Sequence, residues 1–138
     1  MPSTKGRITI PATIDGIGQV AEALDDLLAE SGIDDGVLSQ IHLATEEAVT
    51  NVVTHAYDKK GGNITVLIEM HHGEVIVSIA DQGPAFDPTQ IPPPDITADL
   101  DHRVIGGLGV HLIRSVMDEV VYSRSEDGNL LTMKKKVG

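Results

Sequence analysis

The 138-residue sequence contains no cysteine, no tryptophan, and only one phenylalanine and two tyrosines. The absence of cysteine excludes disulfides and metal sites built on thiolates. The scarcity of aromatic side chains predicts an aliphatic core, in a chain that is 41% hydrophobic. No apolar run reaches the roughly 20 residues that a membrane-spanning helix needs. The opening residues Met1-Pro2-Ser3-Thr4-Lys5 are not typical of a signal peptide. We therefore expect a cytoplasmic location.

Positive charge is also scarce, because 10 lysines and arginines face 21 aspartates and glutamates, for a net charge of −11. Such a charge argues against direct binding to nucleic acid and against an anionic membrane surface. It would also repel a free nucleotide, so a phosphate site here needs a metal ion, backbone amides and a few local cations. The length predicts one domain, residues 1–138, with a core of its own.

Two amphipathic helices are expected in the first half of the chain. Asp15 is the expected N-cap of the first, and Gly32 ends it. Its apolar positions recur at helical spacing: Ile17, Val20, Ala21, Leu24, Leu27 and Leu28. The second helix begins after Asp34 or Asp35 and continues to about Tyr57.

Alternating apolar residues predict about five strands. Residues 7–11 form the first, and 64–70 and 75–79 form a hairpin around a His-His-Gly turn. Residues 120–124 and 130–134 are the last two, joined through an Asp-Gly turn. With a third helix from residue 108, the layout is an α+β two-layer sandwich. We expect a mixed, mostly antiparallel sheet with three helices on one face.

The periodicity disappears between Asp81 and Gly107, in a segment rich in proline and acidic residues. A loop of this length inside a compact domain is usually functional. A disordered linker between domains is the alternative, but too little chain follows it to form a second domain. We interpret residues 84–106 as a mobile lid.

Three polar side chains lie four residues apart on the second helix: Glu47, Asn51 and His55. This spacing places them on one face. They flank a buried stripe made by Ile41, Ala44, Ala48, Val49 and Val52. They could form one wall of a cleft, or simply a solvated shoulder of the helix.

Two glycine-containing stretches add possible ligand contacts. Gly106-Gly107-Leu108-Gly109 stands directly before the third helix, where close backbone approach and unpaired N–H groups suit a polyphosphate. A flexible hinge is the alternative. Asp81-Gln82-Gly83 ends a strand, where aspartate often serves turn chemistry. A buried carboxylate there could instead accept a hydrogen bond from the exocyclic amine of adenine.

Three stretches, in this order, resemble the gyrase/histidine-kinase (GHKL) ATPase superfamily and its Bergerat-type fold. They are EEAVTNVVTHAY, DQGPAFDP and GGLGVHLIRSVMDEVVYSR, beginning at residues 46, 81 and 106. Within that superfamily, the sequence is most similar to the bacterial anti-sigma factor serine/threonine-protein kinases. The resemblance extends over nearly the whole chain.

The resemblance implies ATP and Mg²⁺ as cofactors and assigns roles to individual residues. Asn51 would hold Mg²⁺ through its side-chain oxygen, and Glu47 would act as the catalytic base toward a partner's serine or threonine. Asp81 would bind the adenine amino group, with Gly83 leaving room for the ring.

The same resemblance assigns the phosphates to the second glycine stretch, formed by Gly106, Gly107, Leu108 and Gly109. His55 and Arg103 are further candidates for phosphate or lid contacts. Arg103 is the one arginine or lysine of the acidic lid segment, although it could also be a solvated loop residue.

The implied function is an ATP-dependent serine/threonine kinase that acts as an anti-sigma regulator and phosphorylates an anti-anti-sigma (STAS-type) partner. A homodimer is expected from the same resemblance. One alternative is a catalytically weak nucleotide-binding or purely protein-binding module. Asn129 and Leu130 favour it, because they follow Gly128 where the family often carries threonine. A detached domain that phosphorylates histidine is a third possibility. The Glu47-x-x-x-Asn51 pattern and the absence of a dimerisation-helix segment argue against it.

Overall fold

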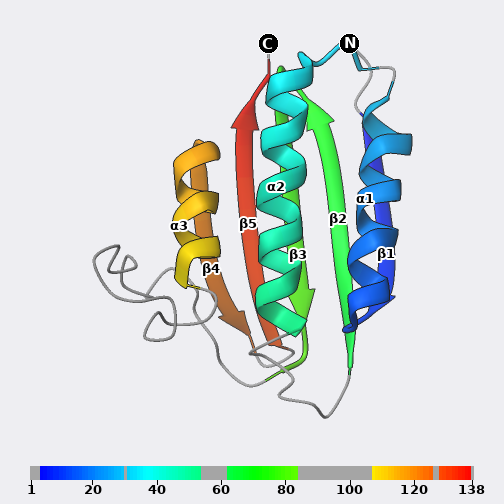
Figure 1. Cartoon of the computed structure of the whole chain (residues 1–138), viewed down its shortest axis with the longest axis vertical. Helices are drawn as coiled ribbons and strands as arrows, with labels where there is room; N and C mark the ends of the chain where they lie inside the picture. The colour runs from blue at the N-terminus through cyan, green and yellow to red at the C-terminus, as the bar shows by residue number, and fades with distance from the viewer. Residues whose placement is uncertain (1–3, 30, 54–61, 84–106, 126–127, 138) are drawn as a thin grey trace.

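The structure is a computed structural model that describes residues 4–29, 31–53, 62–83, 107–125 and 128–137. In this part of the chain, one five-stranded sheet carries three helices on the same face (Figure 1). The expected α+β two-layer sandwich is therefore confirmed. None of the described helices combines the length and apolarity required to cross a membrane.

Helix α1 spans Ile14–Leu28, and its N-cap is Thr13. The Thr13 backbone is extended, and its hydroxyl accepts a 3.4 Å hydrogen bond from the Gly16 N–H. The expected cap at Asp15 is wrong, because Asp15 already lies in the first helical turn. A carboxylate in that turn still interacts favourably with the helix dipole. The cap is therefore the neighbouring residue whose backbone remains extended.

Helix α2 spans Asp35–Asn51 and is capped by Asp34, as one of the two expected alternatives predicted. The Asp34 carboxylate accepts from the Gly36 and Val37 N–H groups, at 3.0 and 3.4 Å. The predicted continuation to Tyr57 lies outside the described residues. Helix α3, Gly107–Val116, begins within the second glycine stretch, as predicted.

The sheet has the order β1-β2-β3-β5-β4. Its strands are β1 Thr4–Pro11, β2 Asn63–His71, β3 Glu74–Asp81, β4 Glu119–Ser125 and β5 Gly128–Lys136. Every described pair is antiparallel, so the sheet is not mixed as expected. Strands β3 and β4 run in the same direction, but β5 lies between them and is antiparallel to both, so these two strands do not form a parallel pair. The β2–β3 turn places His72 and Gly73 at φ of 53° and 73°, as a tight hairpin requires.

The core is aliphatic, as the composition predicted, and it lies between the sheet and the helices. Alternate residues of β2 and β3 point into it, because successive side chains of a strand point to opposite faces. Its fully buried side chains include Ile10, Val20, Leu24, Leu28, Ile41, Val49, Ile64, Val66, Val77, Ile79, Ile113 and Met133. Burying a side chain of this size contributes about 1.5–3 kcal/mol.

Helix α2 runs over the middle of the sheet, along β3 and β5 (Figure 1). Its C-terminal end reaches the same end of the sheet at which β3 ends and β5 begins. The last residues of α2, the last residues of β3 and the first residues of β5 therefore meet at one end of the molecule.

Candidate functional site

A cavity of about 20 Å³ lies where these three elements meet β4. Its lining residues are Ala48, Asn51, Val52, Ile79, Asp81, Tyr122, Asn129 and Leu131. A volume of this size holds a single water molecule at most. The cavity nevertheless brings together Asn51 and Asp81, two residues that the sequence assigned to one site from positions 30 residues apart.

Asp81 is the buried acid of this cavity, with 4% of its surface exposed. Its Oδ1 accepts two hydrogen bonds, from the Gly83 N–H at 2.8 Å and from Asn129 Nδ2 at 2.9 Å. The Gly83 contact closes a turn at the strand end, which confirms the turn chemistry expected there. Within the described residues, both donors bind the same carboxylate oxygen. Oδ2 therefore has acceptor capacity left for a ligand.

Asn129 is directly paired with Asp81 across β3 and β5, and it is 6% exposed. Its Oδ1 accepts a 2.5 Å hydrogen bond from the Tyr122 hydroxyl, while its Nδ2 donates to Asp81. The sequence marked Asn129 only as a departure from the family pattern. In the structure it is a direct hydrogen-bond partner of Asp81.

Strand β4 supports the same turn through Arg124, whose guanidinium Nη1 donates to the Gly83 carbonyl at 2.7 Å. Tyr122 and Arg124 were missed from sequence. They occupy alternate positions of β4, so the sequence alone indicated that both side chains lie on the same face of that strand. Their contacts depend on β4 pairing with β5, so that Tyr122 lies opposite Leu131 and Arg124 lies opposite Asn129.

Asn51 is the last residue of α2 and is 3% exposed. Its side-chain Nδ2 is buried and has no hydrogen-bond partner in the described part of the chain. Buried amides are nearly always paired, so this side chain is one that a ligand could complete. An amide oxygen also suits Mg²⁺, which prefers oxygen ligands and keeps several waters.

Glu47 lies one helical turn before Asn51 and is half-buried. It does not line the Asp81 cavity, so it lies farther along the same helix face. The described residues contain no group of three His, Cys, Asp or Glu side chains able to hold a metal ion. A metal at Asn51 would therefore take most of its ligands from phosphates and water, as Mg²⁺ commonly does.

The remaining predicted site residues are only partly described. His55, Arg103 and Gly106 lie outside the described residues, as does the predicted lid 84–106. Residues 107–109 form the first turn of α3. The first N–H groups of a helix have no partner within it, and they suit an anion.

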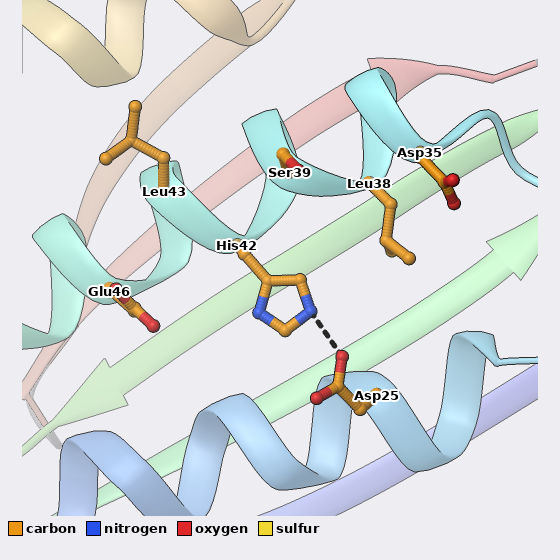
Figure 2. Close-up of a pocket in the computed structure, with 7 residues that line it drawn as sticks. All are labelled: Asp25, Asp35, Leu38, Ser39, His42, Leu43 and Glu46. Carbon is orange, nitrogen blue, oxygen red and sulfur yellow. Dashed lines mark ion pairs between the residues drawn. The ribbon is translucent and has the colours of Figure 1, made fainter.

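A larger groove of about 420 Å³ lies between α1 and α2 (Figure 2). Its lining residues are Asp25, Asp35, Leu38, Ser39, His42, Leu43 and Glu46. His42 Nε2 lies 2.9 Å from Asp25 Oδ1, a contact that joins the two helices across the groove (Figure 2). Asp25 is 67% exposed at its side chain, whereas Asp81 is buried. Retaining a buried carboxylate costs free energy, so the Asp81 cavity is the stronger candidate.

The sandwich, the buried acid at the end of β3 and the glycines that open α3 define a histidine kinase-like ATPase domain. Residues 10–135 match the family model described as "Histidine kinase-like ATPase domain", and the chain belongs to this family. It is 31% identical over 134 residues to the serine-protein kinase RsbW of Staphylococcus aureus strain bovine RF122. That alignment covers 93% of this chain and 84% of the relative. RsbW of strain MRSA252 matches to the same extent.

Solved structures of other proteins show the same fold. The RsbU and RsbW domains of Rv1364c from Mycobacterium tuberculosis superpose with a TM-score of 0.70 at 24% identity. The superposition covers 99% of this chain but only 33% of that longer chain. A chain of the SiaB–SiaC complex from Pseudomonas aeruginosa gives a TM-score of 0.65 at 16% identity. That superposition covers 96% of this chain and 88% of the other. At these identities, the similarity establishes the fold alone.

Proposed function

We propose that this protein is an ATP- and Mg²⁺-dependent serine/threonine kinase that acts as an anti-sigma regulator and phosphorylates an anti-anti-sigma protein of the STAS type. The observation that carries the proposal is the meeting of buried Asp81 and buried Asn51 in one cavity. The 31% identity to a relative named as a serine-protein kinase supports the choice of reaction. The proposal places the chain in the cytoplasm, where sigma factors act.

Adenine would bind at Asp81. With Oδ1 held by Gly83 and Asn129, Oδ2 would accept a hydrogen bond from the exocyclic amine. Gly83 has no side chain to obstruct the ring. A carboxylate that recognises a donor rejects a base that presents an acceptor at the same place, because two acceptors then face each other unpaired.

The phosphates would lie against the start of α3, where the amides of Gly106, Gly107, Leu108 and Gly109 would donate to them. His55 and Arg103 would add local positive charge. These contacts are needed because the chain carries a net charge of −11 and repels a polyanion at a distance.

Mg²⁺ would be held by the Asn51 side-chain oxygen, and it would neutralise charge on the phosphates during transfer. The burial of Asn51 supports this assignment, and its Nδ2, which has no partner among the described residues, would be able to donate to a phosphate oxygen. The helix fixes the side chain in place before nucleotide arrives, which lowers the entropy lost on binding.

Glu47 would act as the general base. Its carboxylate would take the proton from a partner's serine or threonine hydroxyl, whose oxygen forms a bond to the γ-phosphorus as ADP leaves. General base catalysis of this kind contributes roughly 10²–10⁴ in rate. The position of Glu47, half-buried and one turn from Asn51, leaves its carboxylate accessible to a protein substrate.

We also propose that the protein is a homodimer formed through the sheet face that no described helix covers (Figure 1). Charges on this face pair with each other: Lys5 lies 3.4 Å from Glu69, and Lys134 lies 3.7 Å from Glu119. Val121 on the same face is 47% exposed. Two copies of a strongly acidic chain repel least where the charges are already balanced.

Calorimetric titration of ATP and ADP, with and without Mg²⁺, into wild type and Asn51→Ala is the first test. Metal-dependent ATP binding that the variant loses would support the site. Labelled ATP and phosphoamino-acid analysis of the partner would then distinguish phosphoserine or phosphothreonine from phosphohistidine. If no condition gives nucleotide binding, the proposed kinase activity is wrong, and a protein-binding module is the remaining hypothesis.

A further inference from the structure

We propose that Tyr122 and Asn129 are positioning residues that orient Asp81 and thereby set the selectivity of the site for a 6-aminopurine over a 6-oxopurine. The inference rests on the proposed nucleotide site and adds to it the residues that control base selection. It is drawn from a hydrogen-bond chain that runs from β4 through β5 to β3, Tyr122 to Asn129 to Asp81.

The first step concerns the direction of each hydrogen bond. A carboxamide can turn either its oxygen or its nitrogen toward a neighbour. The Tyr122 hydroxyl donates to Asn129 Oδ1 at 2.5 Å, and this leaves Nδ2 on the side of Asp81, 2.9 Å from its Oδ1. The opposite orientation would place the amide oxygen against the carboxylate, with both groups acceptors. The tyrosine donor and the aspartate acceptor therefore select the same amide orientation.

The second step concerns the carboxylate. Asn129 and the Gly83 N–H both donate to Oδ1, so the plane of the Asp81 carboxylate is held by two donors on one oxygen. Within the described residues both donors bind Oδ1, so Oδ2 has acceptor capacity for a ligand at the cavity that Asp81 lines. A ligand group that meets an oriented acceptor must be a donor, such as an exocyclic amine. A 6-oxo group would leave two acceptors facing each other, which is costly in a buried site.

The third step concerns the support of the chain. Asp81 and Asn129 are 4% and 6% exposed, so water competes little with their hydrogen bond. Strand β4 holds the turn a second time, because Arg124 Nη1 donates to the Gly83 carbonyl at 2.7 Å. The residue that donates to Oδ1 from the backbone is thus fixed by the same strand that supplies Tyr122.

The test compares ATP with inosine triphosphate, which differs at the 6-position in carrying an oxo group. Dissociation constants of both nucleotides, with Mg²⁺ present, are measured for wild type, Tyr122→Phe and Asn129→Leu. We expect wild type to prefer ATP by at least about 100-fold. Loss of one neutral hydrogen bond in Tyr122→Phe should reduce the preference about 2- to 10-fold. Loss of the donor to the carboxylate in Asn129→Leu should reduce it roughly 10- to 100-fold.

The ratio of the two dissociation constants distinguishes a loss of Asp81 positioning from general damage to the site. A distorted site would weaken ATP and inosine triphosphate alike, and it would leave their ratio unchanged. Ser123→Ala is the matched control, because it removes a hydroxyl from the exposed face of the same strand. Should Asn129→Leu fail to fold, Tyr122→Phe alone carries the test.

Two outcomes would overturn the inference in distinguishable ways. In the first, wild type prefers ATP and both variants keep the same ratio of dissociation constants for inosine triphosphate and ATP. This result would exclude Tyr122 and Asn129 from base selection and would leave the proposed nucleotide site unaffected. Wild type that binds neither nucleotide would overturn the proposed function and this inference together.

Discussion

Gly128 lies directly against the main chain of Asp81. A Cβ placed on Gly128 would overlap the Asp81 carbonyl oxygen and lie 2.8 Å from the carbonyl carbon. Gly128 also has a φ of 141°, which residues with a side chain rarely adopt. The start of β5 can therefore approach the end of β3 closely enough for Asn129 to pair with Asp81 only if residue 128 is glycine.

Gly128→Ala should lower the free energy of unfolding by roughly 2–4 kcal/mol, because backbone strain and steric overlap combine at one position. Urea unfolding followed by circular dichroism measures this loss. Gly18→Ala is the matched control, since no atom lies within 4 Å of the added methyl group and residue 18 is in a helix. That control should stabilise the protein by about 0.4–1 kcal/mol. Equal stability of the two variants would contradict the close approach described here.

Asn51→Ala should abolish Mg²⁺-dependent ATP binding while leaving the fold intact. The Asn51 Nδ2 is buried without a partner in the described part of the chain, so its removal breaks no described side-chain hydrogen bond. We therefore expect a melting temperature equal to or slightly above that of wild type in the absence of nucleotide. Calorimetry and thermal melts together make the test. Unchanged metal-dependent affinity would remove Asn51 from the metal site.

Glu47→Gln should retain nucleotide binding and lose phosphoryl transfer by roughly 10²–10⁴ in rate. The amide keeps the size of the side chain but accepts no proton at neutral pH. Transfer of labelled phosphate to the partner protein measures the loss. Glu46→Gln is the control, because Glu46 lines the separate groove between α1 and α2 (Figure 2). An active Glu47 variant would remove this residue from the base role.

Val121→Arg should dissociate the proposed homodimer, because it adds an unpaired charge to an uncovered and internally charge-balanced sheet face. Light scattering coupled to size-exclusion chromatography gives the molar mass. Ile14→Arg adds the same charge at a side chain that is 81% exposed on α1, and it should leave the mass unchanged. A wild-type protein that is monomeric at every concentration would contradict the homodimer itself.

Local sequence patterns predicted most of the fold. Alternation along β2 and β3 located the hairpin, and helical spacing located α1, α2 and α3. The prediction of Asp15 as the N-cap of α1 was wrong. Thr13 and Asp15 both carry side chains that can cap a helix, and only the backbone conformation distinguishes them. The expected parallel component of the sheet was also wrong. Strand direction depends on how connections fold back, and residue periodicity does not report that.

Contiguous motifs pointed to Asn51 and Asp81, which the structure brings to one cavity, whereas contacts that depend on pairing between strands were missed. Asp81 and Asn51 each belong to a recognisable stretch. Tyr122 and Arg124 end the third stretch, but the motif assigned them no role, because their partners lie 7 and 41 residues away along the chain. Asn129 was noticed, but its effect was judged from residue type alone. Its register opposite Asp81 gives it a supporting hydrogen bond that residue type does not reveal.

The strand order also governs when the site can exist during synthesis. Strand β5 pairs with β3 on one side and β4 on the other, although it is made after both. Until β5 leaves the ribosome, β4 has no described neighbour in the sheet and Asp81 lacks Asn129. A nascent chain stalled before residue 129 would present α1, α2 and the β2–β3 hairpin without the Asn129 hydrogen bond to Asp81. On the proposed site, ribosome-bound chains that end before residue 129 should therefore fail to bind nucleotide.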